Sequence, residues 1–350
     1  MKDNAGYLEV TEIGEFIRQG GCARRFKLRH EPDLAKLPFA DRLFNPLDLV
    51  LQHVAREREA GWERALQQAG CATLAAPGEK GVPWEEFAAS LRELPVGQPA
   101  YCREVQIAAQ VSAFPLRGRM DFVVVRWVGE RPRVRIVEGK ASRRDRTYHR
   151  LQVTAYRMMF QTLMEQQPVV VGGTALRPED LECVVARIDK ATNASQDILS
   201  LPPLDTWQEE GDLARLLAPD GPLDRILSAD LADLEFEIGP RCDNCSYDWQ
   251  CLTESARQRR LELLALFGST NRALHRGGIT NLDPVADLDL EGPLAKALAA
   301  LPGLAGNPAV LKARAQARRA TLPSRNGEAR GFPVVRLPHS GFGQLPAHEQ

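Results

Sequence analysis

Apolar positions about one helical turn apart predict helices at the start of the chain. These segments are residues 5–30, 45–70 and 83–96. The second of them begins with Asn45 and Pro46, residue types that suit a helix cap and a first helical turn. The chain is therefore expected to begin with amphipathic helices.

The period then changes to that of strands. The segment 101–114 alternates loosely, as a strand would. The segments 117–128 and 132–141 are rich in β-branched residues, and "GERP" between them predicts a hairpin. A helical pattern returns at 146–166, and two strand-like segments follow at 169–178 and 181–189. This order predicts an α/β fold in which helices flank a mixed central sheet.

The composition adds bounds to this picture. The chain has 350 residues, of which 44% are hydrophobic and 26% charged, as in soluble globular proteins of about two domains. The net charge is -1, so any nucleic-acid surface must be local. No export signal and no membrane-spanning run are visible, so we expect a cytoplasmic protein with no membrane partner. Disulfides are then unexpected, and the seven cysteines need another explanation.

The predicted hairpin ends with an acid and a base. Glu138 and Lys140 are two residues apart and point to the same face of a strand. With Glu130 and Arg131 at the turn, paired residues have numbers that sum to about 261, which places Asp121 opposite Lys140. A bulge would shift this register by one residue. Asp121, Glu138 and Lys140 are therefore expected to form one patch.

Two carboxylates beside an apolar surface repel each other and lose hydration, and a divalent cation such as Mg²⁺ or Mn²⁺ relieves both effects. A metal bound there activates water for attack on a phosphodiester, and Lys140 orients that water or helps to deprotonate it. The alternative is an ordinary salt bridge between Glu138 and Lys140 at the strand end, with Asp121 as an exposed neighbour.

The helix after the hairpin begins with basic residues, which suit a nearby phosphate backbone better than they suit the helix dipole. The residues expected to bind nucleic acid are Arg143, Arg144, Arg146, Tyr148 and Arg150. Tyr148, Gln152 and Tyr156 form a stripe at four-residue spacing, which is suited to stacking or hydrogen bonding near the metal. The alternative is an ordinary solvated helix face.

The motifs "GRMD", "EGK" and "HRLQVTAY" together resemble the RecB-like branch of the PD-(D/E)xK nuclease superfamily. The resemblance implies a restriction-endonuclease-like core. It also implies that Asp121 and Glu138 bind the metal, that the Gly139 carbonyl is a candidate third ligand, and that Lys140 is catalytic. Gln152 and Tyr156 would support the substrate and the site.

The sequence departs from this branch in the upstream helix. Relatives usually carry a metal-ligating histidine there, whereas this chain has Arg58 and Glu59 at the corresponding place. His53 lies more than a turn earlier. Glu59 and His53 are both candidate ligands, and a weakened activity is left open.

Three cysteines, Cys242, Cys245 and Cys251, form a C-x2-C-x5-C run, and Cys22 is the best candidate for a fourth ligand. The spacing fits zinc or iron–sulfur. The run resembles that of the CRISPR-associated RecB-like exonucleases and the AddB-type nuclease domains, which implies a [4Fe-4S] cluster that staples the chain, with zinc as the second choice. We expect the remaining three to be small buried side chains: Cys71, Cys102 and Cys183.

The expected domains are a nuclease domain over 1–255, a helical extension over 256–301 that resembles a helix-hairpin element, and a flexible tail over 302–350. The extension is compatible with backbone binding or with ordinary packing on the core.

The preferred function is a Mg²⁺- or Mn²⁺-dependent deoxyribonuclease, an exonuclease on single strands or DNA ends, in repair, CRISPR or defence. No nucleotide-binding loop is visible, so any unwinding would need a helicase or another pathway subunit as a partner. One alternative is a non-catalytic DNA-binding or assembly subunit that keeps the fold and the cluster. The other is a zinc-stapled structural protein with an incidental acidic hairpin.

Overall fold

The structure is a computed structural model that describes residues 6–32, 49–140, 142, 144, 146–188, 196–243, 245–266, 268–300 and 308–322. It divides into two compact units. The first unit comprises Met1–His30 and Pro46–Leu234, and the second comprises Glu31–Asn45 and Glu235–Gln350. The domain boundaries expected near residues 255 and 302 stay predictions.

The described part of the first unit is built on a six-stranded mixed sheet. Strands β2 (Ala72–Thr73), β3 (Ala100–Val111), β4 (Phe114–Val128), β5 (Arg131–Gly139) and β8 (Leu181–Ala186) follow one another in that spatial order. The β3–β4 and β4–β5 pairs are antiparallel, whereas β2 runs parallel to β3 and β8 runs parallel to β5. A short parallel strand, β1 (Leu8–Glu9), pairs with the start of β4. The predicted α/β fold with a mixed sheet is confirmed.

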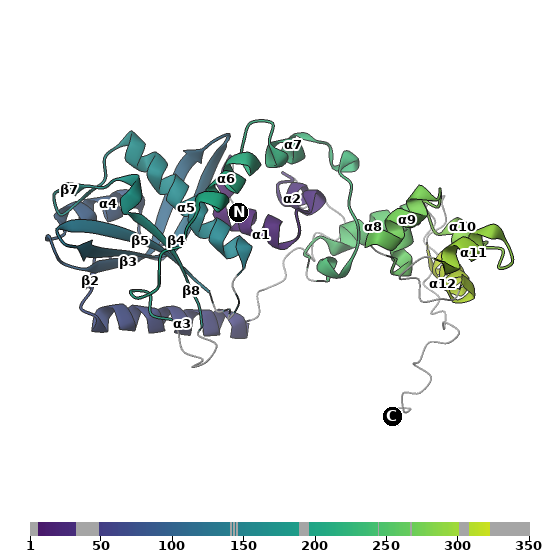
Figure 1. The fold of residues 1–350 in the computed structure, drawn as a ribbon, viewed down its shortest axis with the longest axis horizontal. Coiled ribbons are helices and arrows are strands. Elements are labelled where there is room, and N and C mark those ends of the chain that lie inside the picture. The colour runs from purple at the N-terminus through teal and green to yellow at the C-terminus, as the bar shows by residue number, and fades with distance from the viewer. Residues whose placement is uncertain are drawn as a thin grey trace, which may run out of the picture. The chain divides into compact units, whose positions relative to one another are not determined.

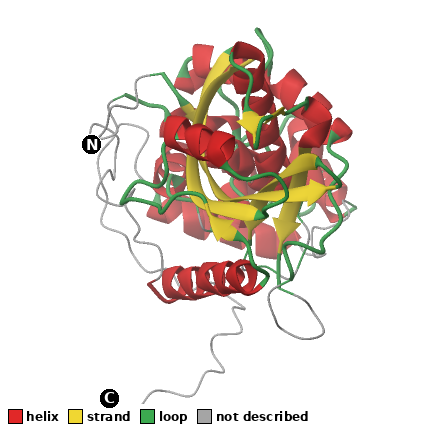
Figure 2. Ribbon diagram, turned by 90° about the vertical axis from the view of Figure 1, so that its left-hand side faces the viewer, coloured by secondary structure: helices red, strands yellow, loops and turns green. Residues whose placement is uncertain are grey.

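Helices cover both faces of this sheet (Figures 1 and 2). Helix α3 (Leu49–Gln68) lies on one face, and α1 (Val10–Arg18), α4 (Trp84–Glu93) and α5 (Thr147–Gln166) lie on the other. Three further helices pack on other helices: α2 (Ala23–Arg29), α6 (Trp207–Leu216) and α7 (Pro222–Ser228). Successive residues of β4 point to opposite faces. Val124 therefore packs with Trp62 and Leu66 of α3, whereas Val123 and Val125 pack with α1, α4 and α5. Both faces are apolar, so the central strands are buried on both sides.

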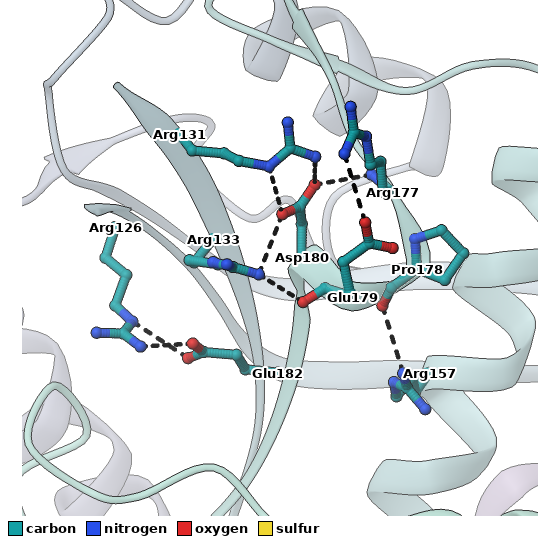
Figure 3. A network of polar contacts seen from close by, with 9 residues as sticks. All are labelled: Arg126, Arg131, Arg133, Arg157, Arg177, Pro178, Glu179, Asp180 and Glu182. Carbon is teal, nitrogen blue, oxygen red and sulfur yellow. Dashed lines mark hydrogen bonds and ion pairs between the residues drawn. The ribbon is translucent and has the colours of Figure 1, made fainter. Parts of the chain in front are cut away.

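A network of arginines and carboxylates fixes the far end of the hairpin to β8. The buried carboxylate of Asp180, in the short 3-10 helix η3 (Pro178–Asp180), accepts ion pairs from Arg131 and Arg133 (Figure 3). Glu182 of β8 pairs with Arg126 and with Arg135, which is fully buried. Because these contacts join three neighbouring strands, they hold β5 in register with β8.

The register of the hairpin differs from the prediction. The paired residues run from Val128 with Arg131 to Phe122 with Val137, so their numbers sum to 259 rather than 261. The turn is formed by Gly129 and Glu130, because Gly129 adopts a positive φ of 61° that suits glycine. The expectation that Asp121 lies opposite Lys140 is therefore wrong, and Asp121 falls level with Glu138 instead.

Two other elements are shorter than the sequence suggested. Gly20 and Gly21, both with positive φ, interrupt the predicted helix over 5–30 and separate α1 from α2. The predicted strand over 169–178 is a small hairpin formed by β6 (Val170–Val171) and β7 (Thr174–Ala175). Glycines at positive φ end regular structure in both places.

The second unit is helical and has a core of its own. Its described elements are η5 (Pro240–Cys242), α8 (Asp248–Gln258), η6 (Leu261–Leu264), α9 (Gly268–Arg276), α10 (Asp283–Ala286), α11 (Pro293–Ala299) and α12 (Pro308–Thr321). Leu274, Leu282 and Leu298 are buried in this core. Residues 308–321, expected in the flexible tail, form α12 instead, because Leu311 and Ala315 pack into the same core. Among the described helices of the chain, none has the length and apolar character needed to cross a membrane.

Candidate active site

Asp121 and Glu138 lie at the point where the β4–β5 ladder ends. The last regular pair is Phe122 with Val137, so both carboxylates come directly after it. The Oδ2 atom of Asp121 accepts a hydrogen bond of 2.7 Å from the backbone N–H of Gly139. Strand β5 stays paired with β8 up to Gly139, and the N–H of Lys140 donates to the Ala186 carbonyl at 2.8 Å. The fold thus brings the predicted acidic pair together.

Glu138 has one satisfied and one unsatisfied oxygen. Its side chain is buried, with 4% of the residue exposed, and Oε1 forms an ion pair with the ammonium group of Lys140. The other oxygen, Oε2, is buried and has no hydrogen-bond partner in the described structure. A buried carboxylate oxygen without a partner is energetically costly, so this atom points to a ligand that the polypeptide does not supply.

Asp121, Glu138 and Lys140 shift one another's pKa values. Burial, followed by the charge of Asp121, raises the pKa of Glu138 to about 7. Burial also raises the pKa of Asp121, although Lys140 and the Gly139 N–H oppose the shift. Burial lowers the pKa of Lys140, but the charges of Glu138 and Asp121 outweigh that effect and leave its pKa above the usual value. Two carboxylates held close together in a buried site favour a cation between them.

A third carboxylate faces this pair from α3. Burial, and then the charge of Asp121, raises the pKa of Glu59, and Glu59 in turn acts on Glu138. The guanidinium of Arg103 lies 3.4 Å from Glu59 and also pairs with Glu63, one turn further along the helix. The side chain of His53, the other candidate ligand, is outside the described residues. Within the described residues, no group of three or more acidic, histidine or cysteine side chains is arranged as a complete metal site.

Sequence reasoning missed Trp62 on α3. Its indole is 2% exposed and lies against Gly139, while its Nε1–H donates to the Gln196 carbonyl at 2.9 Å. Trp62 follows Glu59 by three residues, so the two side chains share one face of α3. The only signal in the sequence is the three-residue spacing of Glu59 and Trp62. Many pairs of residues in an amphipathic helix have this spacing, so it did not identify Trp62.

Helix α5 supplies Gln152 and Tyr156, both buried. Gln152 packs against Gly14 of α1, where an added Cβ would lie 2.9 Å from the glutamine side chain. The Tyr156 hydroxyl donates to the Arg119 carbonyl at 3.0 Å, and its ring packs on Gly118. Burial, and then the charges of Glu138 and Asp121, raises the pKa of Tyr156, so its ring lies near the acidic pair. Both residues therefore join β4 and α1 to α5 around the site.

The predicted nucleic-acid-binding residues differ in their surroundings. Arg144 and Arg146 are exposed, Tyr148 is half-buried, and Arg143 is outside the described residues. Arg150 instead binds Glu209 at 2.6 Å and the Asp205 carbonyl at 3.0 Å. Its guanidinium therefore joins α5 to α6.

The seven cysteines fall into two groups. Cys71, Cys102 and Cys183 are buried, as predicted. Burial raises the pKa of the Cys102 thiol to about 11 and that of Cys183 to about 12. The four cysteines of the predicted cluster are all half-buried. Cys22 precedes α2 in the first unit, and the other three lie within η5, α8 and the turn between them in the second unit.

Comparison with known proteins places this chain in a family. A profile of the PD-(D/E)XK nuclease superfamily matches residues 21–252, which is more than half of the chain. The chain therefore belongs to the PD-(D/E)XK nuclease superfamily, which implies a nuclease. A solved protein described as "Crystal structure of SSO0001" is 16% identical, with a TM-score of 0.34 over 71% of this chain and 87% of that chain. Comparison with curated proteins gave no match.

Proposed function

We propose that this protein is a metal-dependent deoxyribonuclease that hydrolyses phosphodiester bonds at Asp121, Glu138 and Lys140. The observation that carries the proposal is the buried, unpartnered Oε2 of Glu138 beside the carboxylate of Asp121. Mg²⁺ or Mn²⁺ is the kind of ligand that fits, because both ions bind carboxylate oxygens and phosphate oxygens together. Asp121, Glu138 and the Gly139 carbonyl would hold the ion, with Glu59 as a further ligand from α3.

When bound, the ion supplies charge neutralisation at the phosphate and lowers the pKa of water. The chain's own groups supply the orientation. Lys140, fixed by its ion pair with Glu138, donates hydrogen bonds to the attacking water and to a phosphate oxygen. The Gly139 N–H fixes the Asp121 carboxylate by hydrogen bonding to its Oδ2. Tyr148 and the exposed Arg144 and Arg146 follow Lys140 directly along the chain and would contact the DNA strand.

The experiment is digestion of labelled single-stranded and duplex DNA in Mg²⁺ or Mn²⁺. We expect the Lys140→Ala variant to lose activity by at least about 100-fold. The matched control is Lys296→Ala, which removes an exposed lysine from α11 in the second unit and should leave the rate unchanged. Equal digestion by wild type and Lys140→Ala would assign the activity to a contaminant.

A second candidate is a non-catalytic DNA-binding or assembly subunit. The observation that favours it is that the described residues contain no complete group of three metal-ligating side chains. DNA binding without cleavage in any metal would select this candidate. Within the catalytic proposal, we favour exonuclease action on single strands or ends, and any unwinding would come from a helicase partner.

We further propose that Cys22, Cys242, Cys245 and Cys251 bind a [4Fe-4S] cluster, as in RecB-like nucleases. The support is the C-x2-C-x5-C spacing together with the match to the superfamily. Zinc is the alternative, and the two are distinguished by colour and metal content of anaerobically purified protein. An iron-containing brown protein supports the cluster, and a colourless protein with one zinc ion supports the alternative.

A further inference from the structure

A cavity of about 600 Å³ lies in the first unit and borders the stretch of β4 that precedes Asp121. Its wall includes Lys80, Trp84 and Glu85, together with Ala108 of β3 and Gly118 and Arg119 of β4. This volume lies within the range of small-molecule sites, which is roughly 300–1,000 Å³. The residues of this wall do not belong to the catalytic group described above.

Arg119 connects the cavity with the acidic pair. It lines the cavity two residues before Asp121, and its charge acts on the carboxylates of both Asp121 and Glu59. Its side chain is 52% exposed and contacts Glu104 at 3.3 Å. Gly118 is three residues from Asp121, which corresponds to about 10 Å along a strand. That separation is comparable with two or three stacked nucleotides at about 3.4 Å each.

The cavity wall has a cationic group that can bind a phosphate, and an aromatic ring and a carboxylate that can bind a base. Lys80 is exposed, and no ion pair of its ammonium is found in the part of the chain that the structure describes. The indole of Trp84 is half-buried and packs perpendicular to the ring of Phe160, with the ring centroids 4.8 Å apart. Glu85 adds a carboxylate that can accept from the exocyclic amino group of a base. A cation, an aromatic surface and an acceptor together suit a nucleotide.

We propose that this cavity receives one unpaired nucleotide of the DNA strand whose phosphodiester lies at Asp121 and Glu138. A base within a duplex is stacked and paired, so it cannot enter a cavity without being extruded. The cavity therefore selects single strands and frayed ends over intact duplex. This inference rests on the proposed nuclease function and specifies the strand state of its substrate.

The test fills the cavity without removing any of its polar groups. Ala108 is an exposed residue of β3 on the cavity wall, and Ala108→Trp would occupy the space of a base. Gln110, two residues along the same strand and also exposed, lies outside the cavity, so Gln110→Trp is the matched control. Both changes are made in the Lys140→Ala background, so that binding is measured without cleavage.

Fluorescence anisotropy then gives Kd for a labelled single strand and for the blunt duplex of the same sequence. We expect Ala108→Trp to weaken single-strand binding at least tenfold and duplex binding less than twofold, with Gln110→Trp unchanged. Lys80→Glu, a change at an exposed side chain, should give the same selective loss. Unchanged single-strand binding in Ala108→Trp, or an equal loss for both DNAs, would overturn the inference.

These outcomes are separate from those of the nuclease assay. If digestion depends on Lys140 but Ala108→Trp binds single strands normally, the nuclease function holds and the cavity proposal fails. If digestion does not depend on Lys140 while Ala108→Trp loses single-strand binding selectively, the catalytic proposal fails and the cavity remains a strand-binding site.

Discussion

The indole of Trp62 lies so close to Gly139 that a side chain at this position, between Glu138 and Lys140, would collide with it. A Cβ built on Gly139 would lie 2.8 Å from Cζ3 of Trp62 and 3.5 Å from Oδ2 of Asp121. The close approach places the Gly139 N–H against Asp121 and α3 against β5. Through this contact, Glu59 on α3 is held facing the acidic pair.

The first prediction concerns this contact. Gly139→Ala would force Trp62 or Asp121 to move, and overpacking of this kind typically costs about 1–3 kcal/mol. We expect the free energy of unfolding, measured in urea, to fall by that amount. Gly61→Ala is the control, because a Cβ there meets only the Arg64 guanidinium at 3.9 Å and α3 gains a better helix former. A Gly139→Ala protein as stable as wild type would contradict the tight contact.

The second prediction separates two arginines of the basic segment. Arg144 is exposed, so Arg144→Ala should weaken DNA binding for every sequence and reduce the salt dependence by about one phosphate contact. Arg150 is bound to Glu209, so Arg150→Ala should lower stability and leave the salt dependence of binding unchanged. Binding titrations at several salt concentrations measure both. A salt dependence that is reduced in Arg150→Ala but not in Arg144→Ala would show that Arg150, and not Arg144, contacts the phosphate.

The third prediction concerns pH and the buried Arg135. Burial tends to raise the pKa of Glu182, but hydrogen bonds from Arg126 and Arg135 outweigh it and lower that pKa below the usual value. The carboxylate therefore stabilises the fold fully above the unfolded pKa of about 4.3, and this contribution is lost as pH falls through the lower folded pKa. Glu182→Gln should show a shallower loss of stability in that acid range.

At neutral pH the same variant should be destabilised by about 3 kcal/mol, because it leaves the buried Arg135 cation without its charged partner. Glu179→Gln is the control, since the exposed Glu179 carboxylate lies 3.7 Å from Arg177, while the bond from Arg133 goes to the Glu179 backbone carbonyl and is kept (Figure 3). It should change stability by less than about 0.5 kcal/mol. Equal unfolding free energies for the two variants at neutral pH would contradict the role of the Glu182–Arg135 pair.

The fourth prediction concerns the cysteines. If the proposed cluster forms, anaerobically purified protein should contain about four iron atoms per chain, and Cys245→Ser should lose most of them. Cys71→Ala is the control, because this thiol is buried, is not one of the four proposed ligands and should not affect iron content. Iron and zinc are measured together by elemental analysis. Full iron occupancy in Cys245→Ser would exclude Cys245 as a ligand.

The sequence predicted the strands of the sheet better than their register. The β-branched segments around "GERP" identified β4 and β5 because side-chain pattern alone determines strand identity there. The strand pairing depends on which two residues form the turn. Gly129 adopts a positive φ, so the turn is Gly129–Glu130 and not the predicted Glu130–Arg131. The observed pair numbers sum to 259 instead of 261, which moves the partner of Asp121 from Lys140 to Glu138. All three residues therefore stay at the same end of the two strands.

Other parts of the site depend on tertiary packing and left no periodic signal. Trp62 reads as one apolar position of an amphipathic helix, and its contact with Gly139 exists only once α3 packs on the sheet. The pairing of Arg150 with Glu209 joins residues 59 positions apart, which no local pattern reveals. The motif at Gln152 and Tyr156 was visible, but the glycines that receive these side chains, Gly14 and Gly118, were not.

The most direct test of the account is a titration of Mn²⁺ into wild type, Asp121→Asn and Asp287→Asn proteins, followed by electron paramagnetic resonance. Asp287 is an exposed carboxylate of the second unit that pairs with Arg319, so it controls for non-specific binding. We predict one tight Mn²⁺ site in wild type and Asp287→Asn, weakened at least tenfold in Asp121→Asn. Equal Mn²⁺ affinity in all three proteins would show that the acidic pair holds no metal.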